Sequence, residues 1–423
     1  MKLWTGEQEF KSFGKLFNYQ PYVVRQFYKY EEEMKYKLSK IPIGLNTENP
    51  EEIVYLDLKH STHCLILGST GDGKTTLLSG AFDRIFSANG SVFNTDLKGE
   101  YLHKNEPLQP YYHKFILRSE RPKPLNILSY YPHFFTKFVT RQLVQNERFI
   151  QFSLGDMNKF DLLTLLNFVE GRVLEIVDDI WRQYESKEIN TWEEVIEYVG
   201  NIEDIHPTTK RGLIYSLKNL VASDVIGDKF APPDVVKNLN DGLAVNLNLK
   251  GITQFGHMQN PASAYLAIFL RQIYSAKAQH KLNPNKHHFI FIDEINRFCP
   301  LIGHSSSKDE ILKLIDLSRS ERISLWVSSQ DYKRIPDTLM RQATYIFLSY
   351  KVDLEDACEI IKRSLPSEYD VPQTFKAKIA SIIGGMRRYK DGRRDWLVID
   401  KKNRDYFFIQ PLLPLSHLTS EGE

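Results

Sequence analysis

Residues 63–75 read HCLILGSTGDGKT, and this stretch decides the fold class. Its first part, residues 64–67, is a short apolar run followed by glycine, which is typical of a buried parallel strand. Its second part matches G-x-x-x-x-G-K-[ST], in which glycines let several backbone N–H groups point at phosphate oxygens. A helical pattern begins directly afterwards at Thr76. Strand, loop and helix together predict a site for the phosphates of a nucleotide, with a purely structural glycine turn as the alternative.

The residue types in this loop indicate individual roles. Lys74 would reach the β- and γ-phosphates of ATP, and the Thr75 hydroxyl would be a ligand of Mg²⁺. Asp72 is unusual because it places an acid in a loop that binds anions. We expect its side chain to face solvent or to weaken the affinity for nucleotide. The expected nucleotide-binding residues are Gly68, Ser69, Thr70, Gly71, Asp72, Gly73, Lys74, Thr75 and Thr76.

Two further strand patterns end in polar side chains suited to phosphate chemistry. The apolar run 289–292 is followed by Asp293 and Glu294. Open α/β sheets bind ligands at the carboxyl ends of their strands, so we expect Asp293 to hold Mg²⁺ through its water shell. Glu294 would orient and polarise the attacking water. The run 324–328 leads to Gln330, which would contact the γ-phosphate or that water, or is simply a hydrogen-bonded loop glutamine.

Hydrolysis also calls for a cation, because negative charge develops on the oxygens of the transferring phosphoryl group. A guanidinium from a neighbouring subunit can stabilise this charge. Arg319 is the first candidate, and Arg322 and Arg341 are the others. A nucleotide-binding scaffold that hydrolyses little remains a different reading, which only Asp72 supports.

The strand and helix patterns alternate along most of the chain, which predicts an α/β fold with a mostly parallel sheet between helices. From 162 to 180, apolar residues recur instead at helical spacing. We therefore expect an all-α insertion at 134–239. The remaining strand patterns lie at 54–58, 91–96, 243–247 and 345–348.

Composition excludes several classes of protein. Hydrophobic residues make up 42% of the 423 residues, enough for a sizeable core. No apolar run approaches the roughly 18 residues of a membrane span, and residues 1–15 lack the pattern of a secretory signal. Cys64, Cys299 and Cys358 form no CxxC pair, which argues against a zinc site or a disulfide framework. We expect a cytoplasmic protein that could also lie peripherally at a membrane channel.

Charge gives only local indications of a nucleic-acid partner. With 55 basic and 53 acidic residues, the net charge of +2 provides no global basic field. A basic cluster at 387–394, around an Asp-Gly turn, could contact a phosphate backbone, another subunit or only solvent. Lys210 and Arg211 form a smaller basic pair. No signature of sequence-specific recognition is visible, so any DNA contact would be non-specific.

These motifs, in this order, resemble the HerA/FtsK superfamily of ring-forming DNA pumps over residues 41–415. The stretch DLKGE at 96–100 is similar to the D-x-K-G-E of coupling ATPases, and DEINRF at 293–298 resembles their D-E-x-x-R-F. Gln330 resembles their sensor glutamine. Arg319 lies where such proteins place an arginine finger, although serines replace the usual flanking Gly and Lys. Further similarities are IPIG at 41–44, LDL at 56–58, PLN at 124–126 and Ile335-Pro336.

The resemblance implies a RecA-like P-loop core that uses ATP and Mg²⁺. We expect an N-terminal segment at 1–50, core parts at 51–133 and 240–423, and the all-α insertion between them. It further implies a homo-oligomeric ring, a hexamer, that translocates double-stranded DNA and acts with a nuclease or a membrane channel. The alternative function is a coupling ATPase of a conjugation, secretion or viral packaging system that moves nucleoprotein or protein.

Overall fold

The structure, a computed structural model, describes residues 35–137, 143–167, 171–230, 232–251, 259–303, 305–364, 386, 394–403 and 405–417. The strands are β1 (Ile41–Asn46), β2 (Ile53–Leu56), β3 (Cys64–Leu67), β4 (Ser91–Asp96), β5 (Ile127–Pro132), β6 (Glu147–Ile150), β7 (Ala244–Asn248), β8 (His288–Ile292), β9 (Ile323–Ser329), β10 (Tyr345–Ser349), β11 (Trp396–Asp400) and β12 (Asp405–Pro411).

These strands form one 12-stranded sheet in the described part of the chain, with the order β2-β1-β12-β11-β10-β3-β9-β8-β4-β7-β5-β6. Every neighbouring pair from β10 to β6 is parallel. The pairs from β10 through β11, β12 and β1 to β2 are antiparallel. The predicted α/β fold with a mostly parallel sheet is confirmed.

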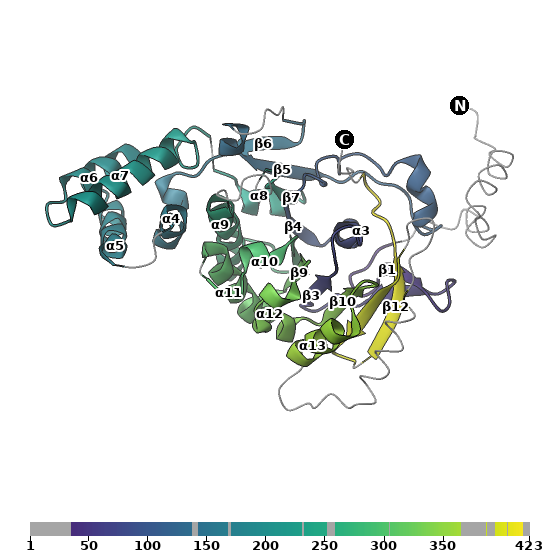
Figure 1. Cartoon of the computed structure of the whole chain (residues 1–423). Coiled ribbons are helices and arrows are strands. Elements are labelled where there is room, and N and C mark those ends of the chain that lie inside the picture. The colour runs from purple at the N-terminus through teal and green to yellow at the C-terminus, as the bar shows by residue number, and fades with distance from the viewer. Residues whose placement is uncertain are drawn as a thin grey trace.

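Helices cover both faces of this sheet (Figure 1). Successive side chains of a strand point to opposite faces, and along β3 Leu65 enters one apolar cluster while Ile66 enters the other. The cluster around Ile66 includes the buried face of α3 (Lys74–Ser87). The cluster around Leu65 includes α9 (Gln259–Ala278) and α11 (Ser306–Glu321), which pack on each other. The strand that leads to the phosphate loop is therefore buried on both sides.

A group of helices between β6 and β7 extends away from the sheet (Figure 1). Helix α4 packs on α9, and α5, α6 and α7 pack on α4 or on one another. Their predicted spacing is confirmed in α5, where Val173, Ile176, Val177 and Ile180 are all buried. The range 134–239 is not all-α as predicted, because it also contains β6, which pairs with β5. The domain boundaries themselves stay a prediction. The helices are α4 (Lys159–Leu166), α5 (Arg172–Glu185), α6 (Trp192–Asn201), α7 (Pro207–Ala222) and α8 (Val235–Asn240).

Short helices complete the fold. They are α10 (Ile295–Phe298), α12 (Asp337–Gln342) and α13 (Leu354–Ser364), with 3₁₀ turns η1 (Pro110–Phe115), η2 (His133–Lys137), η3 (Leu154–Asp156) and η5 (Tyr332–Arg334). Among the residues that the structure describes, no helix is both long and apolar enough to cross a membrane.

Candidate nucleotide-binding site

The phosphate loop lies at the carboxyl end of β3, between β9 and β10. Because β3, β9 and β8 are parallel neighbours, the residues that follow them meet at one edge of the sheet. Gly71 and Gly73 have φ angles of 77° and 92°, a region that favours glycine, and Gly73 is the N-cap of α3. The loop therefore turns directly into a helix N-terminus, where backbone N–H groups favour anions.

Lys74 is buried at the start of α3. Its Nζ donates to the carbonyl oxygens of Gly68 and Ser69, at 2.9 and 3.1 Å, and lies 4.0 Å from Oε1 of Glu294. Burial lowers the pKa of Lys74, while the charges of Glu294 and Asp293 act in the opposite direction. The structure thus brings the predicted lysine of the loop beside both predicted carboxylates.

Gln330 joins the phosphate loop to Glu294. Its Nε2 donates to Oε1 of Glu294 at 2.6 Å, and its Oε1 accepts from the Thr70 hydroxyl at 2.7 Å. Burial raises the pKa of Glu294, and the charge of Asp293 adds to this effect. Residues following three parallel strands are therefore connected by one chain of hydrogen bonds.

Asp293 and Glu294 are presented by an unusual backbone turn. Glu294 has φ 50° and ψ 55°, a left-handed conformation that non-glycine residues rarely adopt. Asp293 Oδ1 accepts from the Glu294 N–H at 3.0 Å and from the Ser328 hydroxyl. Ser328 comes from β9, so the neighbouring strand fixes the Asp293 carboxylate in place.

The available oxygen ligands fit Mg²⁺, which proteins usually hold with few ligands together with substrate phosphates and water. Asp293 offers a buried carboxylate and Thr75 a hydroxyl, both at this edge of the sheet. Within the described residues, no group of three or more His, Cys, Asp or Glu side chains could form an all-protein metal cage. Thr75 and Asp293 therefore remain the proposed magnesium ligands.

Asp72 does not face solvent, so that alternative from the sequence is wrong. Its side chain is 1% exposed, and Oδ2 accepts from the Ser69 N–H and the Ser349 hydroxyl, both at 2.7 Å. Oδ1 lies 3.0 Å from Nζ of Lys351 and 3.9 Å from a guanidinium nitrogen of Arg394. The acid turns away from the anion site and ties the loop to the end of β10.

A cavity of about 390 Å³ opens over the phosphate loop. Six of the nine expected nucleotide-binding residues line it, whereas Gly68, Ser69 and Asp72 do not. The six are Thr70, Gly71, Gly73, Lys74, Thr75 and Thr76. The volume lies within the roughly 300–1,000 Å³ of small-molecule sites.

Lys98 and Glu100 also line this cavity, although neither is among the site residues that the sequence motifs predict. Asp96 shapes this segment, because its carboxylate accepts from the N–H groups of residues 98–101 at 2.8–3.1 Å. Burial, together with the charge of Asp96, raises the pKa of Glu100 to about 7. The DLKGE stretch at 96–100 was the signal that could have identified both residues.

The backbone positions of the candidate arginines lie away from this edge of the same subunit. Helix α11, which contains Arg319, ends just before the amino end of β9, whereas the phosphate loop lies beside the carboxyl end of that strand. Arg322 also precedes β9, and Arg341 is exposed in α12. The side chain of Arg319 is outside the described part of the chain, as are residues 387–393 of the basic cluster.

Comparisons with known proteins identify a family and a fold. A family model described as the central domain of the helicase HerA matches residues 41–267, more than half of the chain. The chain is similar to the structure of VirB4 of Thermoanaerobacter pseudethanolicus, with 13% identity, a TM-score of 0.57, and 88% of this chain and 96% of that chain covered. It is also similar to the bacterial conjugative coupling protein TrwBdeltaN70, with 13% identity, a TM-score of 0.53, and coverage of 94% and 95%. At identities this low, the structural similarity shows a shared fold and nothing further. No curated protein sequence matches.

Proposed function

We propose that this chain, which belongs to the HerA central-domain family within the HerA/FtsK superfamily of P-loop ATPases, couples Mg-ATP hydrolysis to the movement of DNA. The observation that carries the proposal is the hydrogen-bond chain from Thr70 through Gln330 to Glu294. It links the phosphate-binding loop to a carboxylate that can act on water. Such a link is what a motor needs to connect nucleotide state with structure.

The phosphate loop performs the binding step in this proposal. Backbone N–H groups of the loop and of the α3 N-terminus donate to the phosphate oxygens, and Lys74 neutralises the β- and γ-phosphates. Thr75 and Asp293 would hold Mg²⁺, which supplies positive charge against the phosphoryl oxygens when bound. Asp72 keeps the loop in shape through Ser69 and Ser349 and stays clear of the phosphates.

Glu294 is the proposed general base. Its raised pKa brings its basicity closer to neutral pH, where a carboxylate accepts a proton from the attacking water more readily. Gln330 is a positioning residue, because its amide fixes one oxygen of Glu294. When the γ-phosphate leaves, movement of Thr70 would pass through Gln330 to β9 and the adjoining helices.

The positions of the arginines and the family both support the proposed ring. Arg319 precedes the amino end of β9, so it is not delivered to the phosphate loop of its own subunit by that strand. A neighbouring copy could present it there, and a closed ring is the arrangement in which every site is completed this way. DNA in the pore would be held by non-specific phosphate contacts.

The decisive experiment measures ATP hydrolysis with and without linear double-stranded DNA, on protein whose mass is determined by light scattering. We expect Mg-dependent hydrolysis, stimulation by DNA and an oligomer of ring size. Lys74→Ala should abolish hydrolysis. Lys210 lies on α7, far from the nucleotide site, so Lys210→Ala should leave the rate of hydrolysis without DNA unchanged. A rate that Lys74→Ala does not change would remove the ATPase assignment. Hydrolysis that DNA does not affect would remove DNA as the cargo.

A further inference from the structure

The nucleotide cavity continues past the phosphate loop, between two segments that are distant in sequence. One is residues 108–112, at the start of η1. The other is residues 412–417, which we call the C-terminal strap. Leu108, Gln109 and Tyr112 line the cavity from the first segment, and Leu413, Pro414 and His417 line it from the strap. Figure 1 shows the strap, in yellow, leaving β12 and running past α3.

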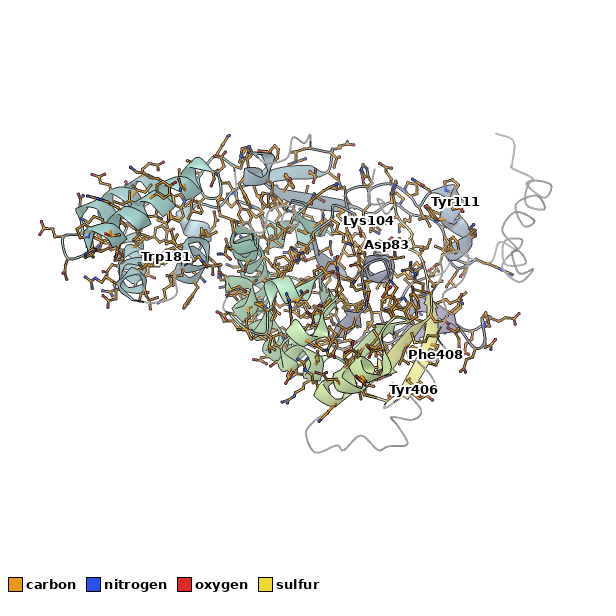
Figure 2. The ribbon with its side chains drawn as sticks, in the orientation of Figure 1. Asp83, Lys104, Tyr111, Trp181, Tyr406 and Phe408 are labelled. Atoms are coloured by element: carbon orange, nitrogen blue, oxygen red, sulfur yellow. The ribbon has the colours of Figure 1, made fainter. Side chains whose placement is uncertain are left out.

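The strap is fixed by a buried charge on α3. Asp83 Oδ2 accepts from the N–H groups of Leu415 and Ser416 and from the Ser416 hydroxyl, at 2.7–2.8 Å. Its Oδ1 pairs with Nζ of Lys104 at 2.8 Å, and both side chains are 0% exposed (Figure 2). A buried carboxylate with four such partners is well compensated for its lost hydration. Because α3 begins at Lys74 and contains Asp83, this one helix positions both the phosphate loop and the strap.

The two segments are also bonded to each other. The Leu108 N–H donates to the Leu415 carbonyl at 3.0 Å, and the Leu413 N–H donates to the Phe115 carbonyl at 3.2 Å. Arg84, the residue after Asp83, donates to the Leu413 carbonyl at 2.9 Å. This wall of the cavity is therefore preorganised rather than formed by loose ends of chain.

The chemistry of this wall differs from that of the phosphate loop. Its lining residues include Tyr112, Pro414 and Leu413, whose rings and aliphatic side chain are surfaces on which a flat aromatic group can pack. Gln109 adds an amide, which can both donate to and accept from the edge of a base. A ligand whose phosphates lie on the loop would extend its other end to this wall.

We propose that residues 108–112 and the C-terminal strap form the subsite for the purine base of the nucleotide, with Tyr112 as its stacking surface. The inference deepens the proposed function, since it assumes that the phosphate loop binds a nucleotide. It goes beyond it by assigning recognition of the base to residues outside every motif that the sequence displays. The neighbouring Tyr111 provides a matched control, because its ring packs edge-on against Tyr112, 5.1 Å between centroids, but does not line the cavity. Tyr111 is 53% exposed, and Figure 2 shows where it lies on η1.

The test is isothermal titration calorimetry of ADP and of pyrophosphate, which carries no base, against the full chain with Mg²⁺. Loss of one aromatic stacking partner should weaken ADP binding about tenfold in Tyr112→Ala. Pyrophosphate affinity should stay within about twofold of the unchanged protein, because its contacts lie on the loop. Tyr111→Ala should change neither affinity, and Tyr112→Phe, which keeps the ring, should bind ADP like the unchanged protein.

The outcomes separate this inference from the function on which it rests. If Tyr112→Ala binds ADP normally, or loses ADP and pyrophosphate equally, the base subsite is wrong even where ATP hydrolysis is intact. If Tyr112→Ala loses ADP selectively in a protein that does not hydrolyse ATP, the subsite stands and the motor function falls. A chain that binds neither ligand overturns both.

Discussion

Replacing Gln330 with leucine should slow ATP hydrolysis while leaving nucleotide affinity nearly unchanged. Leucine cannot donate to Glu294 or accept from Thr70, the two hydrogen bonds that Gln330 makes at 2.6 and 2.7 Å. A hydrogen bond to a charged acceptor contributes roughly 1.5–3 kcal/mol. If that energy holds Glu294 in its reactive position, its loss corresponds to a fall in kcat of roughly 10- to 150-fold.

The assay is steady-state hydrolysis of ATP across substrate concentrations, so that kcat and KM are obtained separately. KM should change little, because Gln330 does not line the nucleotide cavity. Thr70→Val, which removes the other hydrogen bond of Gln330, should lower kcat less, and Thr70→Ser, which keeps the hydroxyl, should behave like the unchanged protein. An unchanged kcat in Gln330→Leu, or a loss expressed only in KM, would refute the positioning role.

Three further predictions concern the loop, the core and acid stability. Asp72→Ala should raise the KM for ATP about tenfold, because it frees Ser69 and Ser349, whereas a repulsive role of Asp72 would make KM fall. Glu120→Gln should lower the free energy of unfolding in urea by about 3–5 kcal/mol, because Glu120 forms a buried bidentate pair with Arg84. The double variant Arg84→Met, Glu120→Leu should recover most of that stability, and an equal loss in the single and the double variant would contradict this. Burial lowers the pKa of His288 from 6.5 to about 3, so the unfolded chain binds the proton first and stability falls as the pH drops below 6.5. His288→Leu should remove about 1.6 kcal/mol of the stability lost between pH 6.5 and 5, measured by urea unfolding, and an unchanged pH dependence would count against the assignment.

Local patterns were enough to predict the phosphate loop and the strands that carry its partners. The glycines, Lys74 and the apolar run before them lie within a few residues of one another, so sequence spacing fixes their geometry. The positions of Asp293 and Gln330 followed from one rule, that parallel strands end at a common edge. Strands β1, β5, β6, β11 and β12 match none of the predicted strand patterns. They lie toward the two ends of the sheet, where partners are set by pairing across the whole chain.

The role of Asp72 and the base-binding wall could not be predicted, because both depend on long-range contacts. Asp72 is buried through Ser349 and Lys351, which lie far along the sequence at the end of β10. The strap is set by the pair of Asp83 and Lys104, whose sequence context reads as an ordinary charged helix face and loop. In each case a charged residue is buried only because remote partners satisfy it.

The left-handed backbone at Glu294 lowers the stability of the fold at the residue that the proposed hydrolysis needs. An L-residue in this conformation is disfavoured by roughly 1–2 kcal/mol, and the burial of its carboxylate adds a further cost. Glycine would relieve both, so natural selection for folding alone would not retain a glutamate here. Among random variants screened only for thermal tolerance, Glu294→Gly should therefore be enriched, and the same variant should be depleted when survival depends on hydrolysis.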